Sequence, residues 1–242
     1  MADAMTPLLR LAEVSVSRHA ARVVTDVSLS VRQGAWFGLI GANGSGKTTL
    51  LRAVAGRLPF ASGSCLLDGA ETVSDRPYRA TQIGFCPPAE TLPDILTGRE
   101  VLKLLAGSED TLWRCLGPLR TALQLDTLLD RRIGDCSAGM RQRIALATAF
   151  ARGQRLVILD EPFNWLDPVA IFDVRETLRS MVDEGLTLIT ALHDLTTLAT
   201  NCDTGLLLAN GRTALTLDEQ ALKTARHDLL DFERRTIALL RS

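Results

Sequence analysis

The stretch GLIGANGSGKTTL, which runs from Gly38 to Leu50, decides how the rest of the sequence is interpreted. Residues 35–40 form a short apolar run that is typical of a buried strand. Residues 47–58 place leucines and a valine on one stripe of a helix. The glycines lie between these two segments. The stretch therefore predicts a strand, a glycine-rich loop and a helix in succession.

The loop itself, GANGSGKT at 41–48, matches the pattern G-x-x-x-x-G-K-[ST] in full. Glycines let the backbone wrap closely around phosphate oxygens, and successive N–H groups at a helix N-terminus supply positive partial charge. We expect Lys47 to reach the β- and γ-phosphates of a nucleotide and the Thr48 hydroxyl to ligate Mg²⁺. The predicted nucleotide-binding residues here are Gly41, Asn43, Gly44, Ser45, Gly46, Lys47, Thr48 and Thr49.

Two further apolar runs end in residues that suit hydrolysis of a phosphate bond. The run LVILDEP ends in Asp160 and Glu161, and the run LITALHD ends in His193. Asp160 is placed to hold Mg²⁺ through water, and Glu161 is placed to polarise an attacking water. A histidine that contacts a γ-phosphate belongs near such a strand end. The helical pattern at 168–184 between the runs predicts a βαβ unit with parallel strands.

Composition excludes several classes of protein. The chain has 242 residues, of which 46% are hydrophobic, and its net charge is −1. A broad attraction to nucleic acid is therefore not expected. The five cysteines are widely spaced, which indicates reduced thiols in a cytosolic protein. We expect neither a signal peptide nor a membrane-spanning run, so any work at a membrane needs another subunit to cross it.

The remaining segments follow simple periodicities. Residues 8–17 and 26–31 alternate as half-buried strands do, and 81–86 and 204–211 read as further strands. Residues 94–133 are leucine-rich with helical spacing and predict a mainly helical insertion. A second helix is expected at 138–153, and an amphipathic helical tail at 217–242.

Taken in order, these motifs resemble those of the ATP-binding subunits of ABC transporters. In that comparison 41–48 is Walker A and 156–161 is Walker B. Ser137 begins SAGMRQR, which aligns with the signature usually written LSGGQ. NWLD at 164–167 matches the D-loop, and His193 matches the switch histidine. The resemblance covers roughly residues 8–215, and the ordered set is far more specific than the glycine-rich loop alone.

The resemblance implies a fold. It is an α/β fold, a P-loop NTPase core with a mostly parallel sheet, an antiparallel β subdomain and an inserted helical subdomain. The whole chain, 1–242, is then one ABC ATPase domain. Within it, 1–87 and 138–215 form the nucleotide-binding core, 88–137 form the helical subdomain, and 216–242 form a helical C-terminal tail.

The resemblance also implies that two such chains close head-to-tail around two ATP molecules. Each site would use Walker A and B of one chain and the signature of the other. Ser137 and Gly139 would contact the γ-phosphate across the interface, where Asp167 would also lie. Glu161 and His193 would be the catalytic residues, and the implied cofactors are ATP and Mg²⁺, the latter held by Thr48 and Asp160.

The sequence departs from the family pattern in two motifs. In the signature, Cys136, Ala138 and Met140 replace the usual leucine, first glycine and glutamine. At the Q-loop position, where the family places glutamine or glutamate, this chain has Pro88, whose side chain cannot ligate Mg²⁺. Glu90 is a candidate to compensate.

The family usually stacks adenine on a tyrosine between the first two strands. The corresponding segment here, SRHAARV at 17–23, contains no Tyr, Phe or Trp. Arg18 or His19 could stack on the base through a planar group, and we favour His19.

The expected function is ATP hydrolysis that powers substrate transport through a separate integral membrane permease. The chain would lie on the cytoplasmic side of the inner membrane, dock through 87–135, and pair with a second ABC ATPase chain, as a homodimer or a heterodimer. LTGRE at 96–100 favours the exporter type. The alternative is a soluble ABC-type ATPase, which the lack of long coiled coils or a second cassette disfavours. A small-molecule kinase or GTPase is disfavoured by the signature segment, and a GTPase also by the missing N-K-x-D motif.

Overall fold

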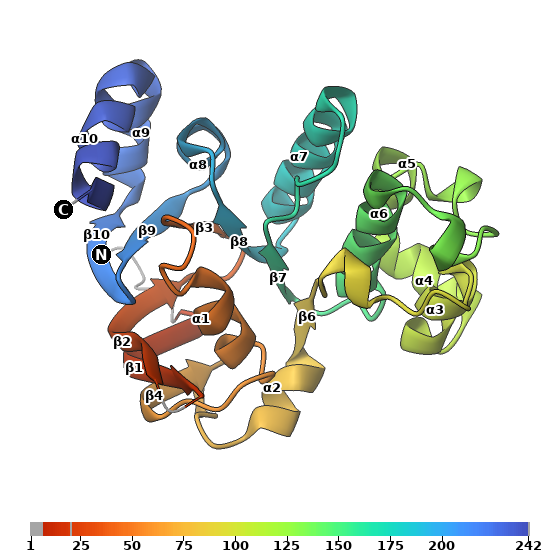
Figure 1. Ribbon diagram of the computed structural model, residues 1–242, viewed down its shortest axis with the longest axis horizontal. Helices are drawn as coiled ribbons and strands as arrows, with labels where there is room; N and C mark the ends of the chain where they lie inside the picture. The colour runs from red at the N-terminus through yellow and green to blue at the C-terminus, as the bar shows by residue number, and fades with distance from the viewer. Residues whose placement is uncertain (1–6, 20, 242) are drawn as a thin grey trace.

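The computed structural model describes residues 7–19 and 21–241 and contains two sheets flanked by helices (Figure 1). The smaller sheet is antiparallel, with strand order β2-β1-β4-β5. Its strands are β1 Leu9–Arg18, β2 Ala21–Val31, β4 Ser62–Leu67 and β5 Ala70–Glu71. This is the antiparallel β unit that the resemblance implied.

The larger sheet has strand order β10-β9-β3-β8-β7-β6, and every neighbouring pair is parallel except β9 and β10. Its strands are β3 Trp36–Ile40, β6 Ile83–Phe85, β7 Leu156–Asp160, β8 Thr187–Leu192, β9 Thr204–Ala209 and β10 Arg212–Leu217. All residues of β3 and β8 are buried. The continuous apolar runs therefore form strands that are covered on both faces, and the predicted mostly parallel sheet is confirmed.

The helices form two groups (Figure 1). Those around the sheets are α1 Lys47–Val54, α2 Arg76–Gln82, α7 Pro168–Asp183, α8 Leu195–Asn201, α9 Glu219–His227 and α10 Leu229–Arg241. Those of the helical part are α3 Gly98–Ala106, α4 Glu109–Leu116, α5 Leu119–Ala122 and α6 Ala138–Phe150, with single 3₁₀ turns η1 Ala89–Thr91, η2 Leu125–Thr127 and η3 Ile133–Asp135. The helical part lies on the opposite side of the molecule from α9 and α10.

Helix α1 packs into the core between the two sheets. Its Leu50, Leu51 and Val54 are buried together with residues of both sheets, including Val14 and Ile158. A second core joins the other face of the large sheet to the helical part. The N-terminus of α1, where the glycine-rich loop ends, is thus fixed by packing from two sides.

Three segments differ from the expectations. Residues 81 and 82 belong to α2, which begins at Arg76 after its cap residue Asp75, so the expected strand at 81–86 is reduced to β6. Helix α8 was not expected, because its sequence LTTLATN has no clear helical pattern. Strand β10 was not expected either, and because it extends to Leu217 the helical tail starts at 219 instead of 216.

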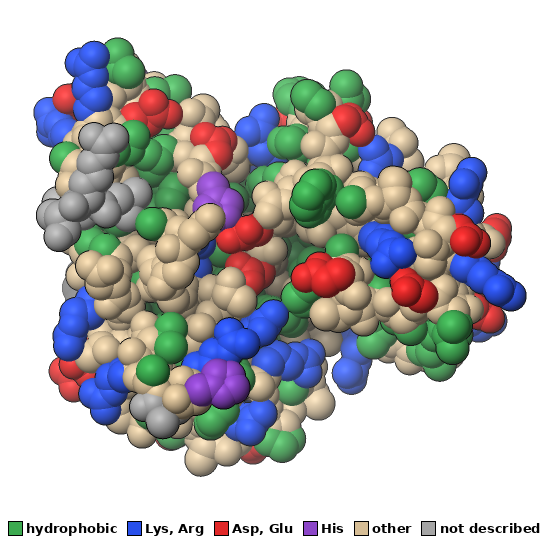
Figure 2. Space-filling view, in the orientation of Figure 1, with side chains coloured by type: hydrophobic (Ala, Val, Ile, Leu, Met, Phe, Trp, Pro, Cys, Tyr) green, Lys and Arg blue, Asp and Glu red, His purple; other side chains and the backbone are tan. Residues whose placement is uncertain are grey.

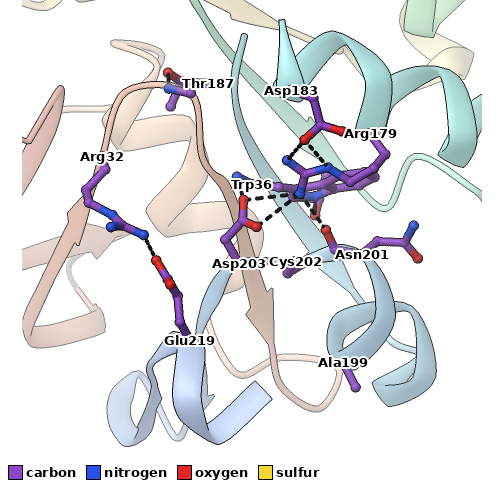
Figure 3. Close-up of polar contacts among 12 residues, drawn as sticks. Arg32, Trp36, Arg179, Asp183, Thr187, Ala199, Asn201, Cys202, Asp203 and Glu219 are labelled. Carbon is purple, nitrogen blue, oxygen red and sulfur yellow. Dashed lines mark hydrogen bonds and ion pairs between the residues drawn. The ribbon is translucent and has the colours of Figure 1, made fainter. Parts of the chain in front are cut away.

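An ion-pair network ties α7 to the start of β9 (Figure 3). Arg179 pairs with Asp183 at 2.7 Å and with Asp203 at 3.1 Å, and it also donates to the backbone carbonyl of Asn201. Asp203 in turn accepts a hydrogen bond from the Trp36 backbone amide at 2.8 Å. The network therefore fixes β3, the strand that leads into the glycine-rich loop.

Candidate functional site

The glycine-rich loop is compact, and its lysine points inward. Lys47 is only 4% exposed. Its Nζ donates hydrogen bonds to the carbonyl oxygens of Gly41 at 2.7 Å and Ala42 at 3.2 Å. Burial lowers the pKa of Lys47, and the charges of Glu161 and Asp160 oppose that effect. The ammonium group is therefore held at the centre of the loop, beside the acidic end of β7.

Asp160 ends β7 next to the loop, as its position after an apolar run predicted. Its Oδ1 atom is buried and has no hydrogen-bond partner. Burial raises the pKa of Asp160, and the Thr48 hydroxyl is the main group opposing that shift. Asp160 and Thr48 line the same cavity, of about 290 Å³. A buried carboxylate oxygen without a partner beside a hydroxyl is suited to hold a cation or a water bound to one.

These two residues fit the way proteins hold Mg²⁺ beside phosphates. Mg²⁺ keeps several waters and takes only one or two protein carboxylates, with the substrate phosphates completing its shell. Among the described residues, no group of three or more His, Cys, Asp or Glu side chains is placed to hold a metal by itself.

Glu161 and His193 meet at the ends of neighbouring strands β7 and β8. His193 Nε2 lies 2.6 Å from Glu161 Oε1, and the Asn164 side-chain amide donates to Glu161 Oε2 at 2.9 Å. Burial alone would raise the pKa of Glu161, but the hydrogen bonds from His193 and Asn164 and the charge of Lys47 lower it overall. Glu161 is therefore an oriented carboxylate that stays ionised at neutral pH. Asn164 was not singled out from the sequence, although it opens the NWLD segment.

The proline-containing segment after β6 lines the same cavity. Pro88 precedes the turn η1, and both Pro88 and Glu90 face the cavity together with Thr48 and Asp160. Glu90 therefore lies at the site where the sequence suggested that it could replace the missing Q-loop glutamine.

The signature segment lies apart from the glycine-rich loop. Ser137 caps helix α6, and its Oγ accepts a hydrogen bond from the Met140 amide at 3.3 Å. Ser137 and Ala138 are exposed. Helix α6 packs against α3 and α4 of the helical part and also contacts β6 and β7 of the large sheet, and its Gln142, beyond the signature, lines the cavity of Thr48 and Asp160. Figure 2 shows a hollow between the two parts on this face, with acidic side chains gathered along it. Ser137 and Gly139 do not join the nucleotide pocket of their own chain.

The D-loop contacts the start of α6 directly. A Cβ added to Gly139 would lie 2.6 Å from the backbone oxygen of Trp165, so only glycine fits this approach. Asp167 caps α7 and pairs with Arg143 of α6 at 2.9 Å, and Arg143 also donates to the Gln124 side chain at 2.6 Å. Arg143 was missed in the sequence, because its partners lie far from it along the chain.

His19 lies at the tip of the hairpin between β1 and β2. It is exposed and has a left-handed backbone, with φ of 48°. No hydrogen bond among the described residues joins His19 to the glycine-rich loop. Its contact with adenine stays a prediction.

Comparison with known proteins places this geometry in a family. A family profile described as "ABC transporter" matches residues 24–164. The chain belongs to the ABC transporter family. It is similar to the Nod factor export ATP-binding protein I of Cupriavidus pinatubonensis, with 30% identity over 94% of this chain and 69% of that protein. It is also 36% identical to a sulfate/thiosulfate import ATP-binding protein of Agrobacterium fabrum, over 77% of this chain and 56% of that one.

Solved structures of ABC cassettes share the fold. The structure of an ATP-binding subunit of an ABC transporter superposes with a TM-score of 0.79 at 29% identity, covering 97% of this chain and 95% of that one. A dimeric cassette bound to ADP and Pi superposes equally well, with a TM-score of 0.79 at 20% identity, covering 87% of this chain and 98% of that one. As a family member, the chain is an ATP-binding and ATP-hydrolysing subunit, a class that works with membrane permeases. The described helices include none with the length and hydropathy needed to cross a bilayer.

Proposed function

We propose that this chain hydrolyses ATP at two composite sites, each formed with a second ABC ATPase chain. The observation that carries the proposal is the separation of two half-sites within one chain. The loop at 41–48 and the carboxylates of β7 form one half, whereas Ser137 and Gly139 lie at the start of α6 in the helical part, Ser137 is exposed, and neither lines the cavity of Thr48 and Asp160. A second chain in the opposite orientation brings its signature to this loop. Because Cys136 and Ala138 differ from the usual signature residues of the family, the second chain could be a related subunit as well as a second copy of this one.

Within each site the residues would divide the work. Lys47 and the loop amides would bind the phosphates, and Ser137 with the N-terminus of α6 would face the γ-phosphate from the partner. Thr48 and Asp160 would hold Mg²⁺, which neutralises charge on the phosphate oxygens. Glu161 would accept the proton of the attacking water, and His193 and Asn164 would fix its carboxylate. Asp167 would lie at the interface, and His19 beside the adenine.

A groove next to β6 and α3 is suited to receive the permease. Its volume is about 580 Å³, and its walls are mostly apolar, with Leu104 and Leu105 from α3 on one side. Three arginines, Arg52, Arg57 and Arg152, also line the groove. We expect a short permease helix with apolar side chains and a carboxylate to dock here.

This docking would place the chain peripherally on the cytoplasmic side of the inner membrane, with no nucleic-acid partner. The relatives named for Nod factor export agree with an export direction, although an import protein is similar too.

The substitution Glu161→Gln tests the proposal. Removing the proton acceptor should lower the ATPase rate roughly 100-fold or more, since general base catalysis contributes about that much. ATP binding should persist, so the variant should accumulate as an ATP-bound dimer in size-exclusion chromatography. Glu176→Gln is the matched control, because Glu176 is exposed on α7, and it should hydrolyse ATP like the parent. A Glu161→Gln protein that turns over ATP at the parental rate would overturn the assignment.

A further inference from the structure

Two hairpin turns in this chain have nearly the same positive φ values at their two central residues. The turn between β4 and β5 contains Asp68 and Gly69, with φ of 51° and 77°. The turn between β9 and β10 contains Asn210 and Gly211, with φ of 49° and 74°. Positive φ at both central residues is the type I′ pattern that suits Asn-Gly and Asp-Gly pairs. The two turns therefore match in φ at both central residues, and they differ in the first of these residues, Asp68 or Asn210, and in what surrounds them.

Gly69 faces open space, whereas Gly211 lies between the backbone of β2 and that of the glycine-rich loop. A Cβ at Gly69 would meet nothing within 4 Å. A Cβ at Gly211 would lie 2.1 Å from the Val23 oxygen in β2. The Gly211 amide donates to the backbone oxygen of Ser45 at 3.0 Å, and the Gly211 oxygen accepts from the Thr25 amide at 2.8 Å. Gly211 thus bridges β2 and the glycine-rich loop.

The back of the glycine-rich loop rests on the same hairpin. A Cβ at Gly41 would lie 2.3 Å from the backbone oxygen of Leu208 in β9. Ser45 is 5% exposed, and its Oγ has no hydrogen-bond partner. The loop therefore has little space to move toward β9, and its position depends on where β9 and the following turn lie.

We propose that Gly211 is a positioning residue for the phosphate-binding loop. It acts through Ser45 and does not touch the nucleotide. The inference rests on the proposed nucleotide site at 41–48. A side chain at 211 cannot be accommodated by rotating a neighbour, because the atom it meets is backbone. The turn must move away from β2, and the hydrogen bond to Ser45 moves with it. Displacement of the loop then misaligns the amides that bind phosphate.

The test compares Gly211→Ala with Gly69→Ala. Both variants place alanine in the same unfavourable left-handed conformation, so both carry the same intrinsic backbone cost. Only Gly211→Ala also meets a backbone atom. The probe is ADP, whose binding needs the loop of one chain and not the partner's signature. We expect Gly211→Ala to weaken ADP binding about tenfold or more, since small displacements at such sites have large effects.

Gly69→Ala should bind ADP with the parental Kd, and titration calorimetry of folded protein measures both. Equal Kd values for the two variants would overturn the inference while leaving the nucleotide site intact. A parent chain that does not bind ADP would overturn the nucleotide site together with the inference.

A second measurement needs no substitution and covers the case in which Gly211→Ala does not fold. Amide hydrogen exchange of the parent, followed by NMR, reports on the Gly211 N–H that donates to Ser45. ADP should slow exchange at Gly211 several-fold, because the ligand stabilises the loop to which this amide is bonded. The Gly69 amide should exchange at the same rate with and without ADP. An unchanged rate at Gly211 in the ADP-bound protein would contradict the coupling.

Discussion

The glycine-rich loop and the signature segment, the two halves of the proposed composite site, differ in how far one chain completes them. The loop is enclosed, with Lys47 only 4% exposed and Ser45 only 5% exposed. The signature segment lies at the surface of the molecule, with Ser137 and Ala138 exposed at the start of α6. Packing between two sheets fixes the first half before any partner arrives. In the proposed site, the second half would act on a nucleotide that another chain brings to it.

The largest expected effect is on the enclosed half. Lys47→Ala removes the one charge at the centre of the loop, and it should weaken both ADP and ATP binding roughly 100-fold, because hydrogen bonds to charged groups are strong. Titration calorimetry on the isolated chain measures this. Lys223→Ala, at an exposed position on α9, is the matched control and should bind both nucleotides like the parent. Unchanged ADP affinity in Lys47→Ala would mean that the loop is not the phosphate site.

A smaller and more selective effect is expected in the exposed half. Gly139→Val would drive a side chain into the Trp165 backbone and displace the signature from the D-loop. We expect a roughly tenfold lower ATPase rate at saturating ATP, with ADP affinity within about twofold of the parent. Thr121→Val is the control, since Thr121 is exposed on α5 and lies outside the signature and the D-loop, and its rate should stay close to the parental one. If Gly139→Val lost ADP affinity as well, the two halves would not be separable within one chain.

The smallest expected effect lies in the pH dependence of the enclosed half. The pKa of Asp160 is raised, so the folded chain takes up this proton more readily than the unfolded one. The parent should therefore gain stability relative to Asp160→Asn as pH falls toward about 4. The pKa of Glu161 is lowered, so the parent should lose stability relative to Glu161→Gln over the same range.

Thermal unfolding of the nucleotide-free proteins between about pH 7 and pH 4 measures both trends, with Tm differences on the order of 2 °C. The opposite signs at adjacent carboxylates are the diagnostic feature. If both Tm differences changed in the same direction with pH, the two carboxyl groups would not have the different environments that the structure shows.

The sequence was most informative for segments whose role depends on residues that lie close together along the chain. The loop at 41–48 was predictable because glycines and a lysine in that spacing serve one purpose, and β3, β7 and β8 were predictable because buried parallel strands are continuously apolar. Strand β10 was missed because most of its residues are exposed and its only apolar alternation, at 215–217, is too short to indicate a strand. Helix α8 depends on its cap residue Asp194, which accepts hydrogen bonds from the Thr196 and Thr197 amides.

The supporting contacts of the site were not predictable for a different reason. Asn164 supports Glu161, Arg143 holds Asp167, and Gly211 supports Ser45. The last two join residues that are distant in sequence. Nothing in a motif specifies which residue will lie behind it after folding. These contacts can be identified only from tertiary structure.

The D-loop tryptophan gives the chain a built-in optical label. Of its three tryptophans, Trp36 is fully buried and Trp113 is half-buried, whereas Trp165 is 75% exposed. Trp165 lines the cavity that holds Thr48 and Asp160 as well as the hollow beside Ala138. Its indole is therefore the one whose fluorescence depends most on water. Closure of a second chain over this face would shift its emission to shorter wavelength and protect it from quenchers, so an unlabelled protein carries its own signal for assembly.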